Sequence, residues 1–161
     1  MRLFCLFFLL GLAPALAADD DAPPREIAGP VNARVLKVRD GDTVEVEAFI
    51  WPLQTVTVAV RLRGVDAPEL KGECEAERAA ARHARDRMAE LVGDGFVQLR
   101  RVSGDKYFGR VLADLASPAE PDIGQRLLRE GLVDAYDGGR RRNWCATIGS
   151  LKPGQPPLGK G

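Results

Sequence analysis

The predicted fold is arranged around Val60-Arg61-Leu62-Arg63-Gly64-Val65-Asp66-Ala67-Pro68-Glu69-Leu70. Apolar residues alternate with two arginines in its first part, which predicts a strand with one buried face. The strand breaks at Gly64, and the turn that follows carries two carboxylates, Asp66 and Glu69. Two cations followed by two acids suit a reaction at a phosphate, because arginine binds the anion while the acids can hold a metal and activate water. Acidic residues and proline are also common in ordinary surface turns, so the interpretation depends on what lies beside this stretch.

The first 17 residues have the features of an export signal. Arg2 gives the positive end, Leu3 to Leu12 form a short apolar run, and Ala15-Leu16-Ala17 is a small-residue cleavage site. A retained membrane anchor is the alternative, but a transmembrane helix needs about 20 apolar residues. We therefore expect a mature chain that starts near Ala18, retains no membrane segment and is exported to the periplasm or secreted.

The mature chain divides into a leader, one domain and a tail. Residues 18–30 are acidic and contain prolines, which predicts a disordered leader. Residues 31–136 form the predicted domain, and residues 137–161 a Gly- and Arg-rich tail. The mature chain has two cysteines, Cys74 and Cys145, an even number for an oxidising compartment. We expect one disulfide that ties the tail to the start of a helix; two unpaired thiols are the alternative.

The domain begins with three predicted strands in a meander. We place them at residues 31–38, 43–49 and 55–63. A change of phase near Leu36 indicates a bulge, and Asp40-Gly41 is a strong hairpin signal. The second strand runs away from this first turn and the third runs back to it. We therefore expect Asp42 and Asp66 to be neighbours in space.

The second half of the domain adds a long helix, two strands and a short helix. Apolar residues at helical spacing predict the long helix, and we place the four elements at residues 73–92, 96–102, 110–115 and 123–130. Five short strands with a helix between the third and the fourth match the partly open barrel of the OB-fold. The predicted class is mainly β with helices (α+β), in one domain that we expect to be a monomer.

Composition excludes several kinds of site. His83 is the single histidine, so chemistry that needs two histidines is excluded, and a structural zinc site would lack a fourth N or S ligand. The full chain has 23 basic and 23 acidic residues, and removal of the signal takes away Arg2 and no acid, leaving a net charge of −1. Nucleic-acid binding would therefore depend on local patches. Oxygen ligation remains, because Asp42, Asp66 and backbone carbonyls suit a hard cation such as calcium or magnesium.

Three motifs resemble, in their order, the signatures of the thermonuclease (staphylococcal nuclease-like) family. They are Asp40-Gly41-Asp42-Thr43, then Arg61 with Val65-Asp66-Ala67-Pro68-Glu69, then Asp105-Lys106-Tyr107-Phe108-Gly109-Arg110. The resemblance covers residues 31–136 and implies an OB-fold. It also implies a calcium-dependent endonuclease that hydrolyses phosphodiester bonds in DNA and RNA and leaves 3′-phosphates.

The resemblance also implies a role for each matched residue. The implied calcium ligands are Asp42, Asp66 and the backbone carbonyl of Ala67. The implied general base is Glu69, and the arginines that neutralise the phosphoryl oxygens are Arg61 and Arg110. The residues implied to lie near the bound nucleotide are Lys106 and Tyr107.

The chain departs from the family at Phe108, an extra residue in the third motif. We expect the turn to absorb it, because Gly109 directly precedes Arg110. A non-catalytic OB module that binds nucleic acid or another protein is the alternative function. Such modules rely on stacking aromatic residues, and this chain has few, with three of its six phenylalanines in the signal.

Overall fold

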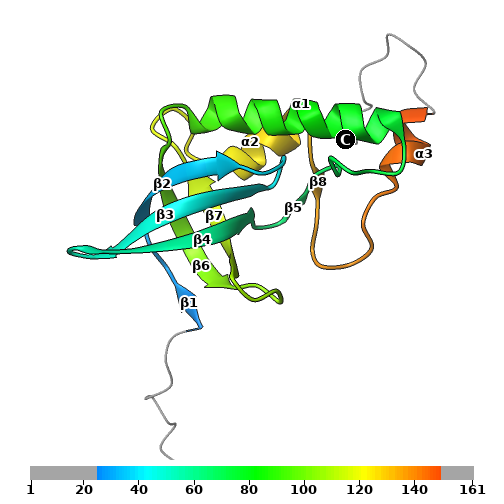
Figure 1. Cartoon of the computed structure of the whole chain (residues 1–161). Coiled ribbons are helices and arrows are strands. Elements are labelled where there is room, and N and C mark those ends of the chain that lie inside the picture. Colours follow the sequence, from blue (N-terminus) through cyan, green and yellow to red (C-terminus); the bar gives the residue numbers. More distant parts are fainter. Residues whose placement is uncertain (1–24, 150–161) are drawn as a thin grey trace, which may run out of the picture.

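The alternating apolar residues of the meander fold as antiparallel strands in this computed structural model, which describes residues 25–149 (Figure 1). The predicted signal peptide 1–17, the first part of the predicted leader and the end of the predicted tail lie outside the described residues. Among the helices of residues 25–149, none combines the length and the apolar character needed to cross a membrane.

Five strands close into a barrel. They are β2 (Val31–Val38), β3 (Thr43–Trp51), β4 (Gln54–Leu62), β6 (Phe96–Gly104) and β7 (Arg110–Ala116). Antiparallel pairs join β2 to β3 and β3 to β4, and β4 then pairs in parallel with β7. β6 pairs with both β7 and β2 and so completes the ring. The predicted five-stranded OB-type barrel is confirmed, and the long helix lies between its third and fourth strands as predicted.

Register shifts bend the strands of the barrel, including one in the β3–β4 pair between Phe49 and Trp51. The predicted bulge in β2 is present as a register shift between Val35 and Lys37. Another shift lies in β6 between Arg100 and Ser103. Beyond this shift β2 no longer pairs with β6. The same edge of β6 pairs instead with a short strand, β1 (Glu26–Ile27). The predicted disorder of residues 18–30 is therefore wrong for β1, because a free strand edge offers backbone partners that the polarity of the leader does not reveal.

The long helix α1 (Glu75–Val92) covers one end of the barrel, with α2 (Ile123–Arg129) and α3 (Trp144–Gly149) packed against it (Figure 1). Its predicted apolar stripe is buried, as Ala81, Ala84 and Met88 are each 0% exposed. The helix starts at Cys74, whose sulfur accepts a hydrogen bond from the Glu77 amide.

The end of the domain returns to the centre of the molecule. A two-stranded sheet pairs β5 (Val65–Asp66) with β8 (Asp134–Ala135), and the Tyr136 amide donates to the Gly64 carbonyl at 2.9 Å. The predicted Cys74–Cys145 disulfide is present and joins the start of α1 to α3. Residues 136–144 are therefore held between β8 and the disulfide, and the predicted Gly- and Arg-rich tail contains a helix, α3, that was not predicted.

Candidate active site

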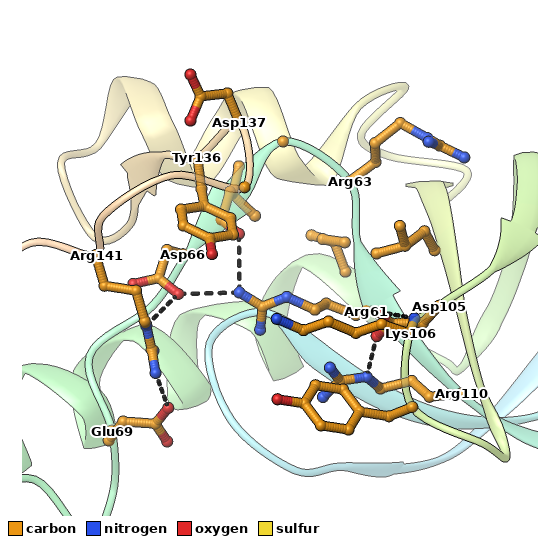
Figure 2. A pocket seen from close by; sticks show the side chains of 16 residues that line it. Arg61, Arg63, Asp66, Glu69, Asp105, Lys106, Arg110, Tyr136, Asp137 and Arg141 are labelled. Atoms are coloured by element: carbon orange, nitrogen blue, oxygen red, sulfur yellow. Dashed lines mark hydrogen bonds and ion pairs between the residues drawn. The ribbon is translucent and has the colours of Figure 1, made fainter.

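A cavity of about 720 Å³ opens where β4, β5, the β6–β7 hairpin and the residues after β8 meet (Figure 2). The cationic side chains that line it are Arg61, Arg63, Lys106, Arg110 and Arg141. The acidic side chains that line it are Asp66, Glu69, Asp105 and Asp137. Although the chain has no net positive charge, five basic side chains line this one cavity. Cavities lined by arginine and lysine commonly bind phosphate groups.

Asp42 lies behind the cavity wall rather than in it. A Cβ on Gly41 would lie 2.6 Å from Ala84 Cβ and 3.0 Å from Ala67 Cβ, so glycine lets this turn pack against α1 and the residue that follows β5. Asp42 is buried, and its carboxylate accepts hydrogen bonds from the Thr43 hydroxyl at 2.8 Å and the Ala67 amide at 2.9 Å. Burial raises the pKa of Asp42 to about 6, and the charge of Arg61 opposes part of this shift.

Arg61 joins the two predicted metal carboxylates. It faces Thr43 across the β3–β4 pair, which places its guanidinium beside Asp42. Its Nη1 donates to Asp42 Oδ1 at 2.7 Å and its Nη2 to Asp66 Oδ1 at 2.9 Å. The predicted proximity of Asp42 and Asp66 is therefore confirmed, since both carboxylates accept hydrogen bonds from the guanidinium of Arg61.

Glu69 lies on the exposed rim of the cavity (Figure 2). The loop that carries it is fixed from below by Glu77, a buried residue of α1 that accepts hydrogen bonds from the amides of Glu69 at 3.3 Å and Glu73 at 3.1 Å. Gly72 lies directly over Glu77, where a Cβ would approach Glu77 Cδ to 2.4 Å. Glu77 is a positioning residue that the sequence analysis missed, although an acid three residues after a helix N-cap is a recognisable signal.

Arg110 faces the same cavity as Arg61 (Figure 2). It begins β7 after Gly109, which has a φ of +78°. Its Nε donates to the Asp105 carboxylate, and its guanidinium carbon lies 4.7 Å from the centre of the Tyr107 ring. Lys106 lies over the same ring at 5.2 Å. The extra Phe108 points into solvent, fully exposed, so the turn absorbs it as predicted.

Tyr136, the last residue of the predicted domain, and Arg141, in the predicted tail, complete the wall. Tyr136 ends the β5–β8 pairing, and its ring centre lies 6.0 Å from the guanidinium carbon of Arg61. Arg141 inserts between Asp66 and Glu69 (Figure 2). Neither residue was predicted in the site from the sequence, because their positions depend on β8 and on the loop after it.

The chemistry of the donor set fits a divalent cation. Two carboxylates and the Ala67 carbonyl are hard oxygen ligands of the type that calcium and magnesium prefer. In the structure these oxygens already surround cationic groups: Asp42 and Asp66 bind Arg61, while Asp66 and the Ala67 carbonyl bind Arg141. These oxygens therefore form a binding site for positively charged groups.

Comparison with known proteins finds relatives and a family for this chain. Two relatives, both described as "Uncharacterized endonuclease", from Escherichia coli and Escherichia coli O157:H7, are each 31% identical over 107 residues. The alignment covers 66% of this chain but 62% of each relative, so the chain matches less than two thirds of their length. The family described as "Staphylococcal nuclease homologue" matches residues 59–145, which include the end of β4, the β6–β7 hairpin, Tyr136 and Arg141. The chain belongs to the staphylococcal nuclease homologue family.

Proposed function

We propose that this protein is a calcium-dependent nuclease that hydrolyses phosphodiester bonds in DNA and RNA as an endonuclease and leaves 3′-phosphates. The observation that carries the proposal is the convergence of Arg61, Glu69 and Arg110 on one cavity, although Arg110 comes from a part of the chain separate from the stretch that carries the other two. Phosphodiester hydrolysis needs an anion site and a base at the attacking water, and these three side chains supply both.

Each residue has a separate task in this reaction. Glu69 takes a proton from the attacking water as the oxygen of that water bonds to phosphorus. The bond from phosphorus to the 5′-oxygen breaks, the electron pair stays on that oxygen, and the oxygen takes a proton from solvent. Arg61 and Arg110 stabilise the negative charge that gathers on the phosphoryl oxygens, more strongly in the transition state than in the ground state. Lys106 and Tyr107, on the hairpin that carries Arg110, contact the nucleotide.

Asp42, Asp66 and the Ala67 carbonyl would hold the metal. A calcium ion there would act as a Lewis acid that polarises a phosphoryl oxygen. We also propose that the protein acts outside the cytoplasm, since a disulfide and a predicted export signal suit an oxidising compartment.

The proposal is tested by incubating the purified protein with supercoiled plasmid and with single-stranded RNA. Reactions contain calcium, magnesium or a chelator, and the phosphate on each product end is identified. We expect cleavage with calcium, none with chelator, and 3′-phosphate ends.

A matched pair of variants separates catalysis from binding. Glu69→Gln removes the proposed base, whereas Glu73→Gln makes the same change of charge in the same loop, at a residue that does not line the cavity with Arg61 and Arg110. Only the first should lose cleavage, and both should still bind DNA. If the wild type binds DNA without cutting it under any metal condition, the protein is a binding module and the nuclease proposal is wrong.

A further inference from the structure

Arg141 uses all three nitrogen atoms of its guanidinium on the predicted metal and base residues. Its Nε lies 2.9 Å from Asp66 Oδ1, its Nη1 lies 2.8 Å from Glu69 Oε1, and its Nη2 donates to the Ala67 carbonyl at 3.3 Å. These hydrogen bonds and ion pairs raise the pKa of Arg141 above its ordinary value. Two of the three proposed metal ligands and the proposed base are thus already occupied by one side chain.

Its neighbours in sequence do not share this position. Arg142 donates to Asp134 at 2.8 Å and lies 4.6 Å from the Trp144 ring, on the other side of the segment. Arg140 is exposed. Only the middle arginine of this run of three points into the cavity, so the contact is a property of position 141 and not of a basic tail in general.

The segment that carries Arg141 is held at both ends. β8 pairs with β5, the strand that contains Asp66, and the disulfide fixes Cys145 to the start of α1. Because the segment cannot diffuse away, the effective concentration of the guanidinium at Asp66 and Glu69 stays high. Yet the Arg141 side chain is 44% exposed, so it can leave its partners without opening the core.

We infer that Arg141 is a built-in cation that occupies the metal site of the free protein and that a divalent ion must displace to bind. This inference rests on the proposed function, since it takes the metal to be held by Asp66 and Ala67. A guanidinium and a divalent ion cannot both take the inward-facing oxygens of Asp66 and the Ala67 carbonyl. The protein therefore binds metal more weakly than its oxygen ligands alone would allow, and Glu69 is released as the metal enters.

The first test measures calcium binding by titration calorimetry at low salt. We expect Arg141→Ala to bind calcium about tenfold or more tightly than the wild type, which corresponds to the loss of one charge-assisted contact. Arg140→Ala removes the same charge one residue away and should change the affinity less than about twofold, as expected for a screened surface charge. Arg141→Lys keeps the charge but not the planar set of donors. Its affinity for calcium should lie between those of Arg140→Ala and Arg141→Ala.

The outcomes separate this inference from the proposed function. If the wild type binds calcium and Arg141→Ala binds it no more tightly than Arg140→Ala does, the inference is wrong and the metal site stands. If only Arg141→Ala binds calcium, the inference is supported. If none of the proteins binds calcium, both the metal assignment and the inference are wrong. Urea unfolding in chelator shows whether each variant is folded. If Arg141→Ala does not fold, Arg141→Lys replaces it in the comparison of calcium affinity with Arg140→Ala.

A second test follows the wild-type side chain directly. The Nε–H resonance of Arg141 in a nitrogen–proton correlation spectrum, assigned by its absence in Arg141→Lys, reports on its bond to Asp66. We expect calcium to shift or broaden this resonance while that of Arg34, which pairs with Glu47 on the outside of the barrel, stays in place. An Arg141 resonance that does not respond to saturating calcium would overturn the inference.

Discussion

The site has an inner half and an outer half that are built in different ways. The inner half consists of Asp42, Arg61 and Asp66, whose side chains are 4%, 16% and 2% exposed. The outer half consists of Glu69, Lys106, Tyr107, Arg110 and Arg141, on loops and strand ends around the cavity mouth, where Glu69 is 52% exposed. Charges in the inner half are part of the folded core, so changing them affects stability. Charges in the outer half can change with little effect on folding.

The largest effect that this comparison predicts is on catalysis in the outer half. Glu69→Gln should reduce turnover by about 10²–10⁴-fold, the usual contribution of a positioned general base. The free energy of unfolding should change by less than about 0.5 kcal/mol, because the side chain is on the surface. Single-turnover cleavage and urea unfolding measure the two quantities. Turnover close to that of Glu73→Gln would remove Glu69 from the role of base.

The second effect concerns the inner half. Arg61→Met leaves Asp42 and Asp66 as neighbouring buried carboxylates without their shared cation, and should destabilise the metal-free protein by about 3–5 kcal/mol. The control is Arg34→Met, which removes an arginine from an exposed cross-strand pair with Glu47 and should cost no more than about 1 kcal/mol. Equal losses for the two variants in urea unfolding would show that the inner half is no more coupled to folding than the surface.

The third effect is the pH dependence of stability that Asp42 introduces. Its pKa of about 6 in the folded protein lies above the ordinary value of 3.8, so the folded state binds this proton more tightly than the unfolded state does. The contribution of Asp42 to stability is therefore full below about pH 4 and is lost as the pH rises through about 6. At about 1.4 kcal/mol per pKa unit, the loss is about 3 kcal/mol.

Urea unfolding in chelator between pH 4 and pH 7 measures this loss as the difference between the wild type and Asp42→Asn. The wild type should lose stability relative to the variant as the pH rises. The control is Asp86→Asn, which changes a carboxylate on the exposed face of α1 and should track the wild type at every pH. A difference between wild type and Asp42→Asn that does not vary with pH would mean that burial does not govern this carboxylate.

The inner half was predictable because strand periodicity and topology fix it. Alternation along β4 sets the direction of Arg61, and the return of the third strand brings Asp66 beside Asp42. Both follow from the side-chain period of two and from hairpin connections, which are local properties of the sequence. The hairpin turn predicted at Asp40-Gly41 is present. The glycine is needed for close contact with α1 as well as for the turn.

The outer half was predictable only in part. Glu69, Lys106, Tyr107 and Arg110 were predicted from motifs, whereas Arg141 lies in the Gly- and Arg-rich tail, where no site residue was predicted. Its position depends on the two-residue pairing of β8 with β5 and on a disulfide, contacts between residues about 70 positions apart. A short strand of two residues has no detectable period, so its effect on the site is visible only in three dimensions.

The smallest predicted effect tests the boundary of the outer half at Phe108. This side chain is fully exposed, while the neighbouring Tyr107 lines the cavity and stacks on Arg110. Phe108→Ser should therefore change the free energy of unfolding by less than about 0.5 kcal/mol. It should also leave cleavage within about twofold of the wild type.

Tyr107→Ser is the matched comparison for Phe108→Ser, because it makes the same replacement one residue earlier in the same turn. It should weaken binding of single-stranded DNA measurably, since stacking of one base on an aromatic ring is worth about 1–3 kcal/mol. Equal losses of binding for the two variants would show that the substrate reaches past Tyr107 to the tip of the hairpin. The outer half would then include the residue by which this chain departs from the family motif, and the extra phenylalanine would be part of the nucleic-acid surface rather than a residue that the turn absorbs.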